Sequence, residues 1–221
     1  MVKKILILAL LGLLMVPFPA RAEETKVIQL AILHPVQFFP ADETIEGLSL
    51  NMFYAINKTV RGLSLGLGVN KTTEKEIGVE LGLGNLADGT AYAWQAGVVN
   101  HVGGRFVGLQ TGVVNATDGD SSGVSLGLFN WTGGYMHGIQ WGLVNVSKGE
   151  AVGLNLGGIN YNGSSFRGFQ GGFVNYAKEM HGLQVGVVNY TQSLDGLQVG
   201  LCNYNGNRKP VEFLPIVNWS F

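Results

Sequence analysis

The side chains that could carry out hydrolysis or hold a metal are few in this chain, and their spacing favours neither chemistry. The 221 residues include one cysteine and four histidines. The sequence has no H-E-x-x-H motif, no cysteine pair and no nucleophile elbow. We therefore predict a non-enzymatic protein with no catalytic residues, no cofactor-binding residues and no metal site. The histidines are His34, His101, His137 and His181.

A hydrolase with a Ser-His-carboxylate site is the enzymatic alternative. Its closest approach in the sequence is Ser122 or Ser125 near His137. His137 and His181, however, both precede the first glycine of a repeated unit and are 44 residues apart. Turn residues inherited with the repeat explain this placement better than catalysis or metal binding.

The elements that carry these residues repeat along almost the whole chain. The clearest copy is GLQVGVVN at residues 182–189, and most copies follow one another at 15-residue intervals. Self-similarity at a fixed short period indicates one structural unit used many times. Each unit ends in an asparagine, and these are Asn85, Asn100, Asn115, Asn130, Asn145, Asn160, Asn175, Asn189, Asn203 and Asn218.

Within each unit, apolar residues alternate with glycine or a polar residue. In the unit that ends at Asn115, for example, Leu109 and Val113 alternate with Gln110 and Gly112. A period of two is typical of a β-strand with one apolar face and one small or polar face. A helix is excluded, because two glycines per unit would cost it about 2 kcal/mol. We expect the apolar residues to face outward and the glycine and glutamine residues to face inward.

Two all-β architectures fit this unit. In the first, an antiparallel up-and-down transmembrane β-barrel, each 15-residue unit is one strand of about 10 residues plus a turn, which is long enough to cross a membrane. In the alternative, a β-solenoid, each unit is one coil and the asparagines stack into a ladder. The segments between strands are mostly polar and offer no apolar return path for a coil, so we predict the barrel, with about 12–14 strands. We count 13 strands, at residues 26–35, 46–56, 60–70, 76–85, 91–100, 106–115, 121–130, 136–145, 151–160, 166–175, 180–189, 194–203 and 211–221.

The inward-facing glutamines are the candidate site residues. One interpretation is that they form a polar, uncharged lumen lining that passes or holds small solutes. The other is that their amides hydrogen-bond across a narrow, filled interior, as buried amides require. The predicted lumen-lining residues are Gln95, Gln110, Gln140, Gln170, Gln184 and Gln198.

The ends of the chain point to export. Residues 1–22 have a positive start, a short apolar run and small residues at Ala20 and Ala22, as a cleaved signal peptide does. Residues 23–221 are then a single repeat-built β domain. The final residue, Phe221, resembles the aromatic end of outer-membrane barrels. Cys202 stands where other repeats carry Val or Ile, so we expect a packed thiol.

The composition excludes one class of partner. Removal of Lys3, Lys4 and Arg21 with the signal peptide leaves 11 basic against 15 acidic residues, a net charge of about −4. Nucleic-acid-binding domains carry a basic face, so we expect no nucleic acid as a partner.

The repeats GLQVGVVN and GLSLGLGVN resemble those of a bacterial surface-repeat family of exported envelope proteins with serial G-L-Q-x-G-L-V-N units. The segments HPVQFFPADETIEGLSLNMFYAIN (34–57) and FLPIVNWSF (213–221) are similar to that family's start and end. The resemblance implies an export signal and a place in the bacterial outer membrane or at the cell surface. It implies no activity and no ligand.

Together these observations predict a non-catalytic outer-membrane β-barrel with a structural or passive pore-like role. Its expected partners are outer-membrane lipid and the barrel-assembly machinery, and its ligand is unknown. The alternative is an extracellular β-solenoid that acts as a surface interaction scaffold.

Overall fold

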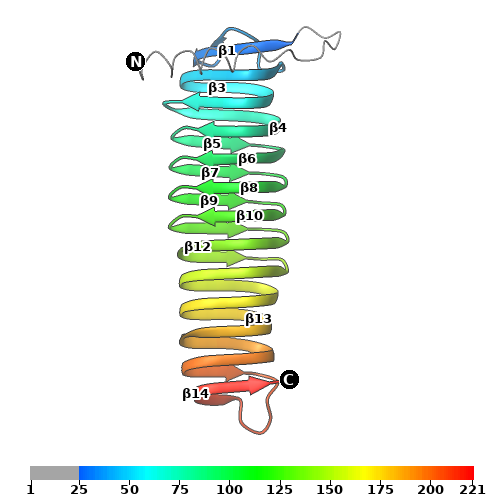
Figure 1. The fold of residues 1–221 in the computed structure, drawn as a ribbon, viewed down its shortest axis with the longest axis vertical. Coiled ribbons are helices and arrows are strands. Elements are labelled where there is room, and N and C mark those ends of the chain that lie inside the picture. Colours follow the sequence, from blue (N-terminus) through cyan, green and yellow to red (C-terminus); the bar gives the residue numbers. More distant parts are fainter. Residues whose placement is uncertain (1–24) are drawn as a thin grey trace, which may run out of the picture.

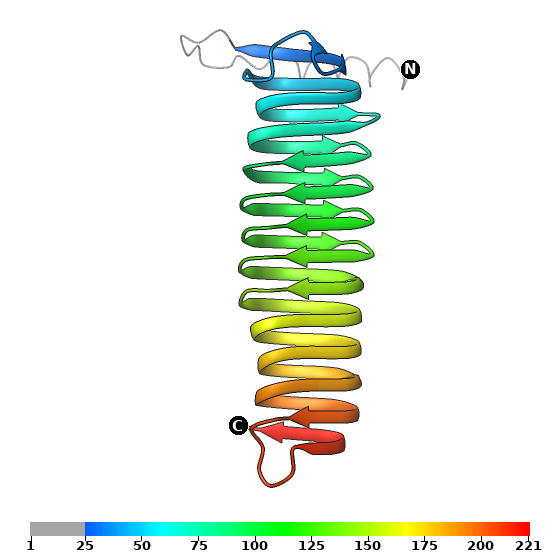
Figure 2. The same ribbon diagram turned by 180° about the vertical axis from the view of Figure 1, so that it is seen from behind.

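The protein is an elongated stack of coils, each about one sequence repeat long (Figures 1 and 2). The computed structural model describes residues 25–221. The expected signal peptide, residues 1–22, lies outside the described residues. The strands are β1 (Lys26–Leu33), β2 (Val36–Gln37), β3 (Thr44–Gly66), β4 (Val69–Leu81), β5 (Gly84–Ala87), β6 (Thr90–Ala96), β7 (Val99–Val102), β8 (Phe106–Thr111), β9 (Val114–Thr117), β10 (Ser121–Leu126), β11 (Phe129–Thr132), β12 (Met136–Ser147), β13 (Ala151–Asn205) and β14 (Phe213–Ser220).

Successive coils pair in parallel with a register of one repeat. In the pairing of β8 with β10, Gly108 lies opposite Gly123. In the pairing of β9 with β11, Asn115 lies opposite Asn130. Equivalent residues of the repeat therefore stack into columns along the axis, which defines a parallel β-solenoid.

The predicted antiparallel barrel is wrong, and the solenoid alternative describes the fold. The error lies in treating each 10-residue segment as one straight strand. Residues 106–115, for example, form β8 and then β9, with a corner at Gly112–Val113 between them. The chain turns this corner and continues along the opposite wall, so 15 residues close a full coil. The expectation of barrel-assembly machinery as a partner loses its basis with the barrel.

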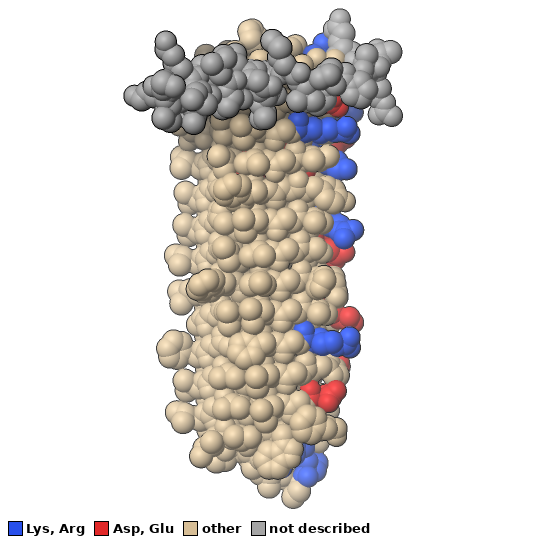
Figure 3. All heavy atoms as spheres, viewed as in Figure 1, with Lys and Arg blue, Asp and Glu red and all other residues tan. Residues whose placement is uncertain are grey.

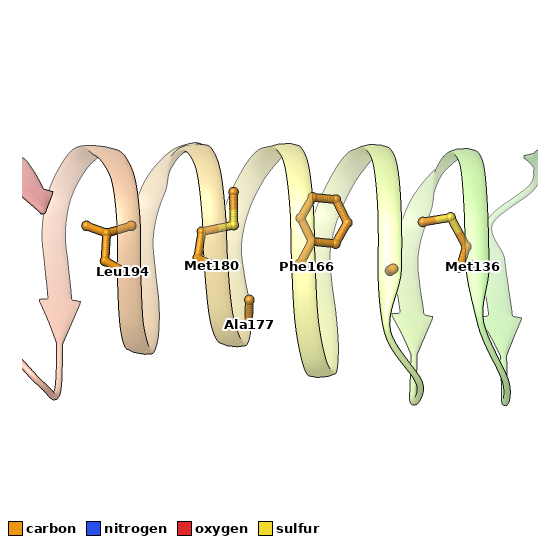
Figure 4. Packing of buried hydrophobic residues seen from close by; sticks show 6 residues of the cluster. Met136, Phe166, Ala177, Met180 and Leu194 are labelled. Atoms are coloured by element: carbon orange, nitrogen blue, oxygen red, sulfur yellow. The ribbon is translucent and has the colours of Figure 1, made fainter. Parts of the chain in front are cut away.

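The interior needs no apolar return path because most of it is polar. Glutamine, asparagine, serine and threonine side chains fill the space between the two walls, and nearly all of them are buried. Apolar packing is confined to short columns of buried side chains, one of which runs along the axis (Figure 4). That column consists of Met136, Ala151, Phe166, Ala177, Met180 and Leu194.

The repeat asparagines form a continuous hydrogen-bonded ladder. From Asn70 to Asn189, each side chain donates from Nδ2 to Oδ1 of the asparagine in the next coil, as Asn115 does to Asn130 at 2.9 Å. Most of them also donate to a backbone carbonyl at the corner, as Asn130 does to Trp141 O at 3.0 Å. The asparagines thus tie neighbouring coils together and satisfy buried carbonyls, as a buried backbone group requires.

Both ends of the stack depart from the repeat. At the N-terminal end, β1 pairs in parallel with β3 and β2 folds back antiparallel onto β1. At the C-terminal end, β14 pairs antiparallel with β13, from Gly196 opposite Ser220 to Tyr204 opposite Phe213. The aromatic C-terminus that suggested a barrel closure instead follows this terminal strand, and Phe221 is 96% exposed.

Candidate functional site

The six glutamines predicted to line a lumen lie in the filled interior of the solenoid, between its two walls. Each is at most 2% exposed. Alternation along β6, β8, β12 and β13 turns them inward, while their neighbours in sequence point outward. The residues are Gln95, Gln110, Gln140, Gln170, Gln184 and Gln198.

Hydrogen bonds between glutamines of adjacent coils occupy this interior. Gln110 Nε2 donates to Gln95 Oε1 at 2.9 Å. Gln184 Nε2 donates to Gln170 Oε1 at 2.7 Å, and Gln198 Nε2 donates to Gln184 Oε1 at 2.8 Å. These glutamine amides are partners for one another, whereas the amide of Asn155, in the same column, makes no hydrogen bond within residues 25–221.

An acidic residue, Glu80, occupies the glutamine column in one coil. It is fully buried and accepts a hydrogen bond from Gln95 Nε2 at 2.7 Å. Burial raises the pKa of Glu80 to about 8, and the hydrogen bond from Gln95 partly opposes the shift. Burial, together with the nearby charge of Glu80, also raises the pKa of the buried Glu76 well above its ordinary value. Neither residue was among the candidate site residues predicted from the sequence. The acidic side chain of Glu80 in a column of amides could have indicated it.

Replacing Glu80 by glutamine is expected to stabilise the protein at pH 8. The folded protein holds this proton more tightly than the unfolded chain, in which the pKa is near 4.5. The contribution of Glu80 to stability is therefore complete below pH 4.5 and is lost as the pH rises toward 8. Glu80→Gln removes this loss and should raise the free energy of unfolding at pH 8 by about 2–4 kcal/mol. Urea denaturation between pH 5 and pH 8 measures the difference.

Glu150→Gln serves as the control, because Glu150 is exposed. It should leave the pH dependence unchanged. Identical pH profiles for wild type and Glu80→Gln would contradict a protonated, buried Glu80.

The outer surface of the coils has the opposite character from the interior. One residue per coil projects from the corner between the two walls, and this apolar edge runs along most of the solenoid. Its members are between 41% and 75% exposed. The apolar edge consists of Leu67, Leu83, Val98, Val113, Leu128, Leu143, Phe173, Val187 and Leu201.

Charged residues of the coils gather on the opposite long edge. Figure 3 shows this on the visible face, where Lys, Arg, Asp and Glu line one side of the stack. They belong to the turns between coils, for example Asp118–Asp120 and Lys148–Glu150. We call these turns the turn edge. The solenoid is thus amphipathic around its circumference.

Aromatic residues lie on one wall between the two edges. Tyr161, Tyr176, Tyr190 and Tyr204 stack face to face, with ring centroids 4.7–5.3 Å apart. Trp131 belongs to the same column, and Lys148 Nζ lies 5.3 Å from its ring centroid. On this wall, the surface side chains therefore change from aliphatic at the apolar edge, through aromatic, to charged at the turn edge.

The backbone at the apolar edge is saturated with hydrogen bonds. Val113 N and Val114 N both donate to Val98 O at 3.0 Å, and Leu128 N donates to Val113 O at 3.0 Å. The asparagine ladder covers corner carbonyls such as Trp141 O. This edge can therefore enter an apolar medium without leaving a backbone N–H or C=O group without a hydrogen-bond partner.

The structure places one of the two candidate serines, Ser122, next to the candidate histidine. Ser122 lies beside His137 in the pairing of β10 with β12, but Ser125 is buried in the interior. His181 Nδ1 and Asp195 Oδ2 are 3.1 Å apart on the surface. Within residues 25–221, no group of three or more His, Cys, Asp or Glu side chains could hold a metal ion.

The expectation of a packed Cys202 is wrong, because the thiol is exposed. Cys202 directly follows the corner residue Leu201, and both side chains point outward. Within residues 25–221, no helix has the length and apolar character needed to cross a membrane. No protein-family model matches the chain, and no curated protein or solved structure matches it.

Proposed function

We propose that this protein is an exported, non-catalytic β-solenoid that acts as a surface scaffold of the bacterial envelope and lies with its apolar edge against lipid. The observation that carries the proposal is the separation of apolar and charged side chains on opposite long edges along most of the solenoid. Monomeric soluble proteins rarely expose such large contiguous apolar areas unless these mark an interaction site.

A lipid surface fits the apolar edge for three reasons. The edge is long, since coils about 4.8 Å apart place Leu67 and Leu201 roughly 40–45 Å from each other. Its backbone groups are already hydrogen-bonded, which hydrocarbon requires. The tyrosine column sits between the apolar edge and the turn edge, where membrane proteins place an aromatic belt.

The fold supports a scaffold more than a pore. The interior is filled by hydrogen-bonded amides, and the glutamines therefore act as structural ties between coils. The same kinds of surface side chain recur in successive coils, so contacts with lipid would be distributed along the length of the solenoid. Binding strength should grow with the apolar area that enters the membrane.

Charged substitutions at the apolar edge are expected to abolish lipid binding. The test uses residues 23–221 and flotation with vesicles of phosphatidylethanolamine and phosphatidylglycerol. Wild type should float with the vesicles, and the fraction bound of Leu128→Asp/Leu143→Asp should fall at least tenfold, because a carboxylate is costly to bury in hydrocarbon. Both leucines are at least 60% exposed, so the fold should tolerate the changes.

The matched control adds the same charge at the turns between coils. Ser165→Asp/Gln192→Asp should float like wild type, because these side chains lie away from the apolar edge. Wild-type protein that stays in the aqueous fraction, or a Leu128→Asp/Leu143→Asp variant that floats normally, would contradict the proposal.

A further inference from the structure

An apolar groove lies at the N-terminal end of the solenoid, beside the strands that fold back there. Its volume is about 1070 Å³, which is in the range of small-molecule sites. The β1–β2 side contributes Leu30, Ile32 and Phe38, and the coil corners contribute Leu67 and Leu83. Among residues 25–221, no charged side chain lines it.

Hydrogen bonds hold the β1–β2 wall of this groove in place. Gln37 Nε2 donates to Phe39 O at 2.7 Å and to Ile56 O at 2.9 Å. Gln29 Oε1 accepts from Phe39 N at 2.9 Å. The wall is therefore tied to the first coil, and the groove exists before any ligand enters.

One polar atom in the groove lining lacks a hydrogen-bond partner. Every later asparagine in the ladder accepts at Oδ1 from the coil before it, as Asn85 does from Asn70. Asn51 donates to Asn70 but has no asparagine before it. Within the described chain, Asn51 Oδ1 accepts no hydrogen bond although the side chain is only 7% exposed. The direction of the ladder thus leaves a buried, unpartnered acceptor on a residue that lines the groove.

This combination selects an alkyl chain with one polar end rather than a protein segment. A peptide brings a donor and an acceptor with every residue, and the apolar walls could not satisfy them. An alkyl chain has no polar groups along its length, and a single donor at its head matches the single open acceptor. The groove also opens beside Leu67 and Leu83 of the apolar edge, which offers a route of entry from lipid.

We propose that the groove binds a single-chain amphiphile whose alkyl chain lies between β1–β2 and the coil corners and whose head donates an O–H or N–H to Asn51 Oδ1. This site shares Leu67 and Leu83 with the apolar edge, but binding in the groove does not depend on the membrane docking proposed for that edge.

Displacement of a fluorescent probe tests the site. The probe is N-phenyl-1-naphthylamine, which is apolar and carries one N–H, and it is used with residues 23–221 in the absence of vesicles. Its fluorescence should rise on binding, and dodecan-1-ol should displace it. The methyl ether of undecan-1-ol, which has a similar chain but no donor, should displace it about fivefold less well, as expected for one lost hydrogen bond.

Two variants separate the groove from the apolar edge. Phe38→Asp, at a side chain 69% exposed, should weaken probe binding at least tenfold and leave vesicle flotation intact. Leu128→Asp should leave probe binding unchanged, because Leu128 does not line the groove. Equal probe affinity for Phe38→Asp and wild type would overturn the site. So would equal displacement by alcohol and ether, or a protein dimer that Phe38→Asp dissociates.

Discussion

Replacing Gly138 by alanine is expected to unfold the solenoid locally and to lower its free energy of unfolding by about 4 kcal/mol or more. Gly138 has φ = +138°, a conformation that residues with a side chain rarely adopt. A Cβ at this position would lie 1.9 Å from Gly123 O in the preceding coil. The two coils would have to separate, which breaks the parallel pairing of β10 with β12. Urea denaturation followed by circular dichroism measures the loss.

Gly206→Ala is the matched control for this prediction. A Cβ at Gly206 would meet its nearest heavy atom, Gln192 O, at 3.4 Å, which is ordinary contact. This variant should stay within about 1 kcal/mol of wild type. Similar losses for the two alanine variants would show that close approach between coils does not explain the glycine column.

The repeat period and the direction of the side chains could be predicted from the sequence. Strict alternation places Gln110 inward and Leu109 outward, and the structure confirms this for the glutamine column. The same alternation exists in a barrel strand and in a solenoid wall, so it could not separate the two folds. The distinguishing feature was the asparagine repeated in every unit, whose ladder requires parallel neighbours in register.

The barrel was preferred because a coil was assumed to need an apolar core. Hydrogen bonds join buried amides of adjacent coils, as between Gln110 and Gln95, and a polar group that has such a partner costs little to bury. The corner between the two walls of each coil could not be predicted from the alternation either. At Val113 and Val114 two consecutive residues both point outward, which breaks the period of two at one place only. That break also explains why Cys202 is exposed.

The proposed sites differ in how far the sequence could reveal them. Glu80 stands in a column of amides, and an acid there could have been recognised once inward orientation was accepted. The apolar groove beside β1 and β2 could not be predicted from the sequence. It depends on β2 folding back onto β1 and on the spacing of these strands from Leu67 and Leu83. Neither strand belongs to the repeat, so the periodic pattern carries no information about how the two pack.

Replacing Asn130 by alanine is expected to cost about 3–5 kcal/mol, because it removes the centre of the ladder. Asn130 is fully buried, accepts from Asn115 Nδ2 and donates to Asn145 Oδ1 at 2.8 Å and to Trp141 O at 3.0 Å. Its loss removes a hydrogen bond from three groups. Asn145 Oδ1 loses the donor that Asn130 supplies, whereas Trp141 O keeps Gly127 N and Asn115 Nδ2 keeps Leu126 O. A buried polar group without a partner costs about 1–3 kcal/mol.

Asn207→Ala provides the comparison, since Asn207 is exposed in the turn before β14. It should leave the urea midpoint nearly unchanged, whereas Asn130→Ala should shift it strongly. Hydrogen exchange should also accelerate at amides of the coils on both sides of Asn130, because the ladder couples neighbours in both directions. If Asn130→Ala were as stable as Asn207→Ala, the ladder would be a consequence of coil stacking and not one of its causes.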